Sequence, residues 1–357
     1  MKKILLALAG LVVLVFIGLH LFGEPLITRS MERQVVRNLS GAAFAEMNDG
    51  LNVVICGAGS PMPDPLRSGP CVVVIAGTRI MVVDVGSGSV RHFAPAGIPV
   101  GKVADVFITH FHSDHIDGLG ELALQRWGNG ANTEPMPVHG PAGIEQVVAG
   151  FNTAYTQDFS YRIAHHGTTI MPPSGEGSAA VPFDLPAEGQ GTVVLDVDGI
   201  KVTAFSVTHA PISPAVGYRF DYKGRSVVIS GDTVKSANLQ KFATGADLLI
   251  HEALNEQMVK ILTDGAHEAG AANIEQITKD ILGYHTTPVQ AGEIAQAAGV
   301  KQLVLYHIVP PLPIRPMERM FVKGVSDVYS GPVLVSRDGT WIDLPAGSTE
   351  IKVGKRF

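Results

Sequence analysis

The chain has 357 residues, of which 46% are hydrophobic and 17% charged, and it contains 40 glycines. Such a composition excludes an intrinsically disordered chain and fits one large α/β domain or two average ones. The net charge of −6, from 27 basic and 33 acidic residues, gives no overall positive charge for a nucleic-acid backbone, so we expect no nucleic-acid partner.

The N-terminus carries an apolar run from residue 4 to residue 22, directly after Met1-Lys2-Lys3. As a helix this run would rise about 28 Å, close to the hydrocarbon thickness of a bilayer. We therefore expect residues 1–23 to form an uncleaved signal anchor, with a cleaved signal peptide as the alternative. Either form implies export, with the protein anchored in the inner membrane and facing the periplasm or cell exterior, or secreted.

The body of the chain follows a short connecting segment. Residues 24–50 have mixed charge and no strand pattern, so we interpret them as a membrane-proximal linker or helix. Residues 51–357 are then expected to form a single domain. It opens with three apolar runs that predict strands of an antiparallel sheet, at 51–56, 71–76 and 79–83.

Only two cysteines are present, Cys56 and Cys71. They lie at the end of one expected strand and the start of the next, so a disulfide would suit an oxidising compartment. Two separate buried thiols fit the same positions. Neither cysteine is expected to bind a metal, because the chain has no CxxC pair.

A cluster of imidazoles and a carboxylate follows the apolar run 106–108, in the sequence His110-Phe111-His112-Ser113-Asp114-His115. Neutral imidazole and carboxylate are ligands that zinc prefers. His110 and His112 share one face if the strand continues to its end. Asp114 and His115 come where the chain leaves the strand, so they can point toward a second position nearby. This pattern predicts a metal site.

The middle of the chain is less regular. Residues 118–125 and 144–151 are expected to be helical, with a short strand ending at His139 between them. From 152 to 191 the sequence is rich in glycine, proline and serine without a sustained period, so we interpret it as a long loop facing the substrate.

The second half of the chain repeats one sequence pattern, a short apolar run with an ionisable residue at its carboxyl end. The runs 202–208, 227–230, 248–250 and 303–306 precede, in order, His209, Asp232, the pair His251-Glu252, and His307. Functional groups of layered α/β proteins gather at the carboxyl ends of strands, so we expect these residues to converge on one site. Helices at 273–282 and 288–298 are expected to cover the strands.

The candidate metal ligands are too many for one tetrahedral ion and suit two ions that share a bridging carboxylate. They are His110, His112, Asp114, His115, His209, Asp232 and His307. Asp84, at the end of the expected strand 79–83, is a candidate for a hydrogen bond that fixes a ligand imidazole. The alternative for Asp84 is a turn residue before a glycine loop.

These motifs together resemble the metallo-β-lactamase superfamily, whose HxHxDH signature matches residues 110–115. The resemblance implies a four-layer αβ/βα sandwich over about residues 51–345. Within the superfamily the chain is similar to the ribonuclease Z-like branch, which also contains the type II arylsulfatases. The opening Gly57-Ala58-Gly59-Ser60-Pro61, the His251-Glu252-Ala253 element and His285-Thr286-Thr287-Pro288 carry this closer similarity.

The resemblance also implies a role for each residue. One zinc ion would be held by His110, His112 and His209, and the second by Asp114, His115 and His307, with Asp232 bridging them. His285 would donate a proton to the leaving group, oriented by Glu252, since imidazole titrates near neutrality. By the same resemblance, Asp114 is assigned both as a metal ligand and as a catalytic residue. Members of this branch often dimerise, so the resemblance allows a homodimer and leaves the oligomeric state open.

The expected reaction is hydrolysis of a small-molecule ester, foremost a phosphodiester or an aryl sulfate. Lactones and β-lactams are alternatives, because hydroxide generated at the metal ions, the nucleophile that the resemblance implies, attacks all of them. A ribonuclease Z-like RNA endonuclease is disfavoured by export, by the acidic charge and by a segment 150–191 without the Gly-rich basic arm of those enzymes. Two other classes are disfavoured. An iron-dependent redox enzyme of the same fold, by the pattern of the di-iron flavoproteins, would carry Glu in place of His112. A binding protein without activity would have lost at least one ligand, and none of the seven is missing.

Overall fold

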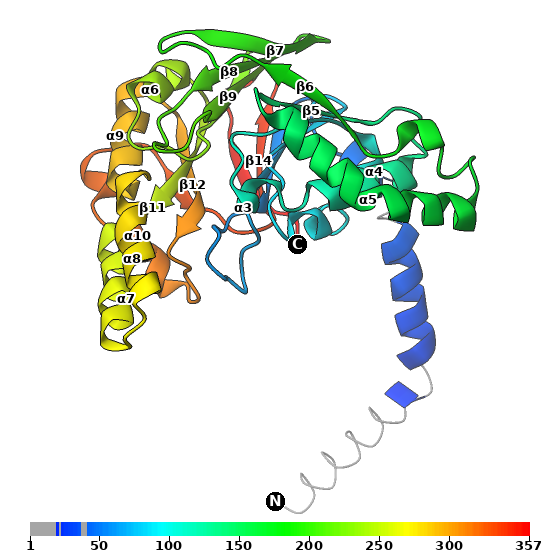
Figure 1. Ribbon diagram of the computed structural model, residues 1–357, viewed down its shortest axis with the longest axis horizontal. Helices are drawn as coiled ribbons and strands as arrows, with labels where there is room; N and C mark the ends of the chain where they lie inside the picture. The colour runs from blue at the N-terminus through cyan, green and yellow to red at the C-terminus, as the bar shows by residue number, and fades with distance from the viewer. Residues whose placement is uncertain (1–18, 21–22, 37–40) are drawn as a thin grey trace, which may run out of the picture.

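Two β-sheets lie face to face, with helices on both outer sides (Figure 1). The computed structural model describes residues 19–20, 23–36 and 41–357. The eight-stranded sheet has the order β15-β14-β1-β2-β3-β4-β5-β6, and the seven-stranded sheet has the order β13-β12-β11-β10-β9-β8-β7. The sandwich predicted for the α/β domain is therefore confirmed.

The strands of the eight-stranded sheet are β1 (Gly50–Gly57), β2 (Cys71–Ala76), β3 (Arg79–Val83), β4 (Val103–Phe107), β5 (Met136–Pro141), β6 (Ser178–Phe183), β14 (Thr340–Pro345) and β15 (Lys352–Lys355). Those of the other sheet are β7 (Gly191–Val197), β8 (Ile200–Ser206), β9 (Val216–Tyr222), β10 (Arg225–Ile229), β11 (Leu248–Leu254), β12 (Gln302–Val309) and β13 (Val333–Val335). The helices are α2 (Ala42–Ala45), α3 (Ser113–Ile116), α4 (Leu119–Gly130), α5 (Ile144–His166), α6 (Ala237–Ala243), α7 (Glu256–Glu268), α8 (Ala272–Asp280), α9 (Pro288–Ala298) and α10 (Pro316–Phe321).

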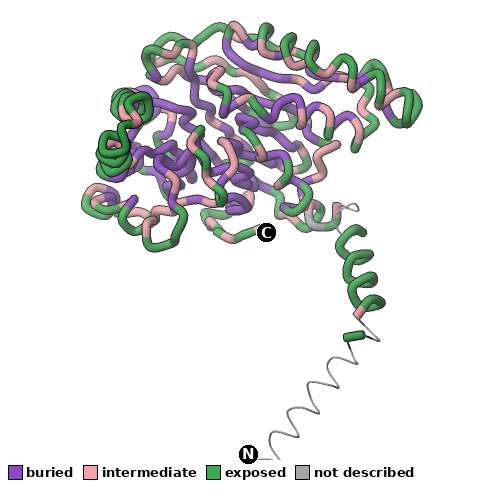
Figure 2. The backbone as a smooth tube through the Cα atoms, turned by 60° about the horizontal axis from the view of Figure 1, so that its bottom comes forward, coloured by how far each residue is buried: buried purple, intermediate pink, exposed green. Residues whose placement is uncertain are grey.

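The alternation of side chains along the strands divides the core into layers. In β1, Leu51, Val53 and Ile55 point toward the other sheet, while Val54 points to the outer face beside α4 and α5. The central strands are buried on both faces, which explains their nearly continuous apolar sequences. A separate apolar cluster joins the outer face of the seven-stranded sheet to α6 and α9. Buried backbone accordingly fills the centre of the molecule in Figure 2.

The opening strands pair as expected. β1 pairs antiparallel with β2, and β2 pairs antiparallel with β3, so the predicted antiparallel start of the domain is confirmed. A disulfide joins Cys56 to Cys71 across the loop between β1 and β2. Of the two alternatives for the cysteines, the structure contains the bonded pair.

The interpretation of residues 152–191 as a long loop is wrong. The helix expected at 144–151 continues to His166 as α5, and β6 and the start of β7 follow. Along this helix only Ile144, Val148 and Phe159 are buried, so the sequence lacks the apolar stripe that identifies a surface helix. Phe159 packs edge-on against Trp127 of α4, with ring centroids 5.5 Å apart, which attaches α5 to the body.

Residues 23–36 are helical. The expected membrane segment 4–22 lies outside the described residues, apart from residues 19 and 20. Within the part of the chain that the structure describes, we find no helix with the length and apolar character needed to span a bilayer.

Candidate metal centre

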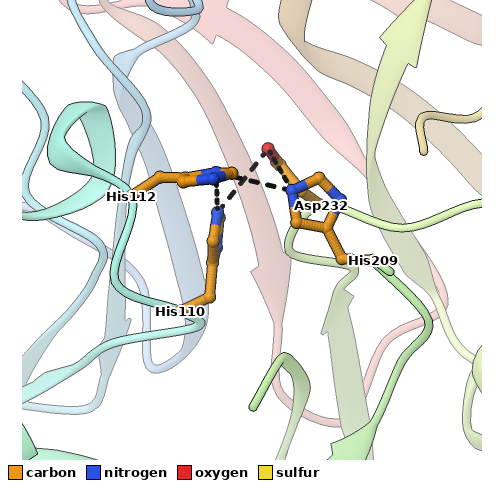
Figure 3. Close-up of side chains that lie close together, drawn as sticks. All are labelled: His110, His112, His209 and Asp232. Carbon is orange, nitrogen blue, oxygen red and sulfur yellow. Dashed lines mark hydrogen bonds and ion pairs between the residues drawn. The ribbon is translucent and has the colours of Figure 1, made fainter. Parts of the chain in front are cut away.

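All seven candidate ligands meet at one edge of the sandwich. His110 and His112 follow β4, and Asp114 and His115 lie in the short helix α3 that comes next. His209 follows β8, and Asp232 follows β10. Because both sheets end at this edge, segments far apart in the sequence supply ligands to the same place, as Figure 3 shows for four of them.

His307 reaches the site through an irregularity in β12. The strand pairs in parallel with β11, but Glu252 faces Tyr306 while the next residue, Ala253, faces Ile308, so His307 is bulged out of the ladder. Its φ of 45° lies in the left-handed region, which is uncommon for a non-glycine residue. The bulge directs the imidazole toward the ligand cluster instead of toward a sheet face. The neighbouring strand β11 continues past His251-Glu252 to Leu254, whereas the sequence predicted that it ends at His251.

The first ligand group contains His110, His112, His209 and Asp232, whose ligand atoms lie within 4.8 Å of one another. His110 Nε2 lies 2.9 Å from His112 Nδ1, and His209 Nε2 lies 3.4 Å from the same atom. Figure 3 shows the three rings and the carboxylate pointing toward one another. Three ring nitrogens that face each other this closely present a set of lone pairs suited to a cation.

The second group contains Asp114, His115 and His307, again within 4.8 Å. His307 Nε2 is 3.3 Å from Asp114 Oδ2 and 3.3 Å from Asp232 Oδ2. His115 Nε2 lies 3.4 Å from Asp232 Oδ2. Two of the seven candidate ligands are carboxylates, and of these only Asp232 contacts histidines of both groups. A bridging ligand requires this position.

The protonation states of the cluster suit cation binding. Burial lowers the pKa of His110 well below its usual value, and burial also lowers the pKa of His112 and of His209. Burial alone would raise the pKa of Asp232, but charge attraction to His307 and His115 outweighs it and holds this pKa well below the usual range. Neutral imidazoles and an ionised carboxylate are the forms that coordinate metals.

Three buried atoms of the cluster have no hydrogen-bond partner, His115 Nε2, Asp232 Oδ1 and His307 Nδ1. An unpaired polar atom in the interior is costly, so native structures rarely leave one without a function. Burial would lower the pKa of His115, yet Asp232, Asp114 and Asp84 raise it well above its usual value. A positive charge is thus favoured where these carboxylates meet, and a donor set of imidazoles and carboxylates fits zinc.

Hydrogen bonds behind the cluster fix the orientation of two ligands. Asp84 Oδ2 lies 2.8 Å from His115 Nδ1, and the two carboxylate oxygens also accept from the backbone N–H and hydroxyl of Thr109. His209 Nδ1 lies 2.9 Å from the carbonyl oxygen of Tyr284. Both rings are thereby held with Nε2 toward the cluster. The sequence motifs named Asp84 but gave no signal for Thr109 or the Tyr284 carbonyl.

We expect Asp84→Asn to weaken zinc binding about 10- to 100-fold, because His115 loses the charged acceptor that fixes its ring. Competition with a chromogenic chelator measures this affinity. Asp105→Asn is the matched control, since Asp105 is also buried and also contacts a histidine, His139 at 3.1 Å, outside the cluster. Equal zinc affinity in Asp84→Asn and the wild type would contradict this role for Asp84.

His285 and Glu252 form a pair beside the ligands. His285 Nδ1 lies 3.2 Å from Glu252 Oε1, which also accepts from the backbone N–H of Thr286 at 2.9 Å. Burial would lower the pKa of His285, but the charge of Glu252 and this hydrogen bond outweigh burial and raise the pKa to about 9. The ring of His285 stacks on that of His307 with centroids 5.5 Å apart.

His285 is also close enough to Asp232 and His307 to form a third group of ligand atoms within 4.8 Å. The geometry therefore allows His285 two chemical roles, donor of a proton or ligand of a metal. The hydrogen bond from Nδ1 to Glu252 leaves one ring nitrogen for either role.

Comparisons with known proteins identify the family of the chain. The model of the β-lactamase superfamily domain matches residues 81–308. Ribonuclease Z of Mycobacterium avium (strain 104) is 35% identical over 264 residues, 73% of this chain and 87% of that protein. Ribonuclease Z of Mycobacterium bovis (strain BCG / Pasteur 1173P2) is 33% identical over 290 residues, 81% of this chain and 96% of that protein.

Among solved structures, the short form of human tRNase Z matches with a TM-score of 0.55 and 23% identity, over 82% of this chain and 99% of that chain. At this level of identity the likeness concerns the fold, and it agrees with the two facing sheets described above. The chain therefore belongs to the metallo-β-lactamase superfamily and is a metallo-β-lactamase-fold hydrolase similar to ribonuclease Z.

Proposed function

We propose that this protein is a dinuclear zinc hydrolase that cleaves a small phosphodiester outside the cytoplasm. The observation that carries the proposal is the arrangement of two ligand groups that share Asp232, with the His285–Glu252 pair beside them. A site of this kind brings together the positions for a nucleophile, a stabilised anion and a proton donor, which ester hydrolysis needs.

His110, His112 and His209 would hold one zinc ion, Asp114, His115 and His307 the second, and Asp232 would bridge the two. When bound, such ions supply a water of lowered pKa as nucleophile and positive charge that stabilises the developing oxyanion. Thr109 and Asp84 keep the histidines oriented, and the buried surroundings strengthen the interactions of the carboxylates.

His285 supplies the proton that the leaving group needs. Glu252 Oε1 holds Nδ1, so the other ring nitrogen is free to face the ester oxygen that departs. The charge of Glu252 raises the pKa of His285 against the effect of burial, so the imidazolium is populated at neutral pH. A protonated donor matters most when the leaving alcohol is a weak acid, because an alkoxide leaves slowly.

A phosphodiester substrate is favoured by similarity to relatives named ribonuclease Z. An aryl sulfate is the second candidate of the same chemistry, and a lactone or β-lactam remains an alternative. RNA itself is disfavoured by the segment from residue 144 to 191, which carries five carboxylates and one arginine. That arginine, Arg162, is paired with Asp158, so α5 offers little positive charge to a phosphate backbone.

Export is part of the proposal, with residues 4–22 as the membrane anchor or as a removed signal. The Cys56–Cys71 disulfide supports an oxidising compartment, because such bonds persist mainly outside the cytosol. The protein would then act on its ester at the outer side of the inner membrane, or in the medium if the segment is cleaved.

The test combines metal analysis with a substrate panel. We expect about two zinc ions and negligible iron per chain, and turnover of aryl phosphodiesters above aryl sulfates, lactones, nitrocefin and a precursor transfer RNA. His112→Ala should abolish this turnover, whereas His165→Ala, at an exposed histidine of α5, should not. Stoichiometric iron, or no His112-dependent turnover of any ester in the panel, would refute the proposal.

A further inference from the structure

A large cavity opens next to His285. Its volume is about 810 Å³, which is within the range of small-molecule sites. The walls come from the loop after β1, from α7 and α8, and from the proline-rich segment after β12. α7 and α8 lie side by side at the edge of the molecule opposite α5 (Figure 1), and their contact includes a 3.0 Å hydrogen bond between the hydroxyls of Thr263 and Thr278.

The cavity wall is almost entirely apolar. Apart from His285, its polar side chains are Ser60 and Thr278. The Thr278 hydroxyl donates to its own helix, to the carbonyl of Ile274 at 2.9 Å, so it offers little to a ligand. The wall has no charged residue besides His285 that could bind an anion or a sugar-phosphate chain. A ligand that fills this space must therefore be apolar.

The helices leave apolar side chains uncovered where they line the cavity. Ile261 is 63% exposed, Ile274 53% and Ile277 52%. All three line the cavity, so they form one continuous apolar surface rather than scattered residues. Soluble proteins rarely expose such a surface without a ligand or partner to cover it.

The position of His285 specifies which part of a substrate enters the cavity. One side of its ring faces the ligand cluster, where it stacks on His307 and lies near Asp232. The same residue belongs to the cavity wall. The proton donor therefore stands between the scissile bond and the cavity. The ester oxygen that His285 protonates carries the leaving group, so the leaving group extends into the cavity.

We infer that the substrate is a phosphodiester whose leaving alcohol is a long alkyl or alkylaryl group, bound in the apolar cavity formed by α7, α8 and the loop after β1. This inference rests on the proposed phosphodiesterase function and adds the class of the leaving group. In the reaction, water attacks phosphorus and releases a proton to the solvent, the bond between phosphorus and the leaving oxygen breaks, and that oxygen takes a proton from His285, which is then reprotonated from the solvent. The products are a phosphate monoester and the apolar alcohol.

The test uses the full-length protein and methyl 4-alkylphenyl phosphates with alkyl chains from methyl to octyl. The alkylphenol leaves, and its acidity hardly changes with chain length, so differences in rate report on binding. We expect kcat/KM to rise about fourfold for each added methylene until the cavity is filled. A mirror series of phenyl alkyl phosphates, with the chain on the oxygen that stays, should show a nearly constant kcat/KM.

Ile277→Gln should reduce this dependence on chain length, because the variant makes the cavity polar. The dependence is measured within each variant as the ratio of kcat/KM for the 4-octylphenyl ester to that for the 4-methylphenyl ester. Ile170→Gln is the matched control, since Ile170 is equally exposed, at 52%, but lies outside the cavity. It should keep the full dependence. Sedimentation of the wild type and Ile277→Gln examines self-association through the same surface.

The outcomes separate the two proposals. If no ester is hydrolysed, the phosphodiesterase function itself fails. If the shortest ester is hydrolysed but kcat/KM does not change with the leaving chain, the function stands and the apolar leaving group is refuted. The inference is also overturned if Ile277→Gln keeps the chain-length dependence, or if it only converts a dimer to a monomer.

Discussion

Asp232→Asn is expected to lower kcat/KM for a phosphodiester at least about a thousandfold. The Asp232 carboxylate lies 3.3 Å from His307, 3.4 Å from His115, 3.9 Å from His110 and 4.0 Å from His209. Asparagine keeps the shape but removes the charge that both ligand groups share. A loss of about 4 kcal/mol of transition-state stabilisation corresponds to three powers of ten in rate.

Metal analysis accompanies the kinetics, and we expect Asp232→Asn to retain clearly less than two zinc ions per chain. Asp247→Asn is the control for loss of a buried carboxylate, because Asp247 is also buried but pairs with Arg225 and Lys301 away from the cluster. That control, where folded, should keep the metal content and rate of the wild type. Full metal content together with a loss of less than tenfold would show that Asp232 does not bridge the ions.

His285→Ala is expected to discriminate between good and poor leaving groups. Loss of a general acid costs about 10²- to 10⁴-fold, and we expect this loss with alkyl phosphodiesters. With 4-nitrophenyl esters, whose leaving group needs no proton, the loss should be below about tenfold. The measurement is the slope of log kcat/KM against the pKa of the leaving alcohol, which should become steeper in the variant.

Two results would assign His285 differently. An equal loss for all leaving groups would exclude the proton-donor role, and a fall in zinc content would make His285 a ligand, as its closeness to Asp232 and His307 allows. Tyr284→Phe serves as the control, because the Tyr284 ring packs against that of His285, with centroids 5.0 Å apart, and we assign it no part in proton transfer. It should retain the wild-type slope.

The residues that the sequence named as candidate ligands lie together in the fold because they follow the ends of strands. The apolar runs before His110, His209 and Asp232 are interior strands, and layered folds bring such ends together. His307 was also predicted, but not its bulge, because a bulge depends on how β12 pairs with β11 and leaves no local pattern.

Features that depend on tertiary packing could not be predicted. α5 has few buried residues, so its sequence resembles a loop although the chain folds it as a long helix. The helix expected at 273–282 corresponds to α8, but only the folded arrangement places its Ile277 and Ile261 of α7 around a common cavity beside His285. The disulfide likewise required knowledge of how β1 and β2 lie.

The Cys56–Cys71 bond has a consequence for the cavity. The residues between the two cysteines, 57–70, form a closed covalent ring with a sequence separation of 15 between the bonded residues. Ser60 and Met62, which line the cavity, belong to this ring. A ring of this size lowers the conformational entropy of the unfolded chain, which stabilises the folded state by about 3 kcal/mol. One wall of the cavity is thus a macrocycle that exists only in the oxidised protein, so the redox state of the compartment sets how firmly that wall is held.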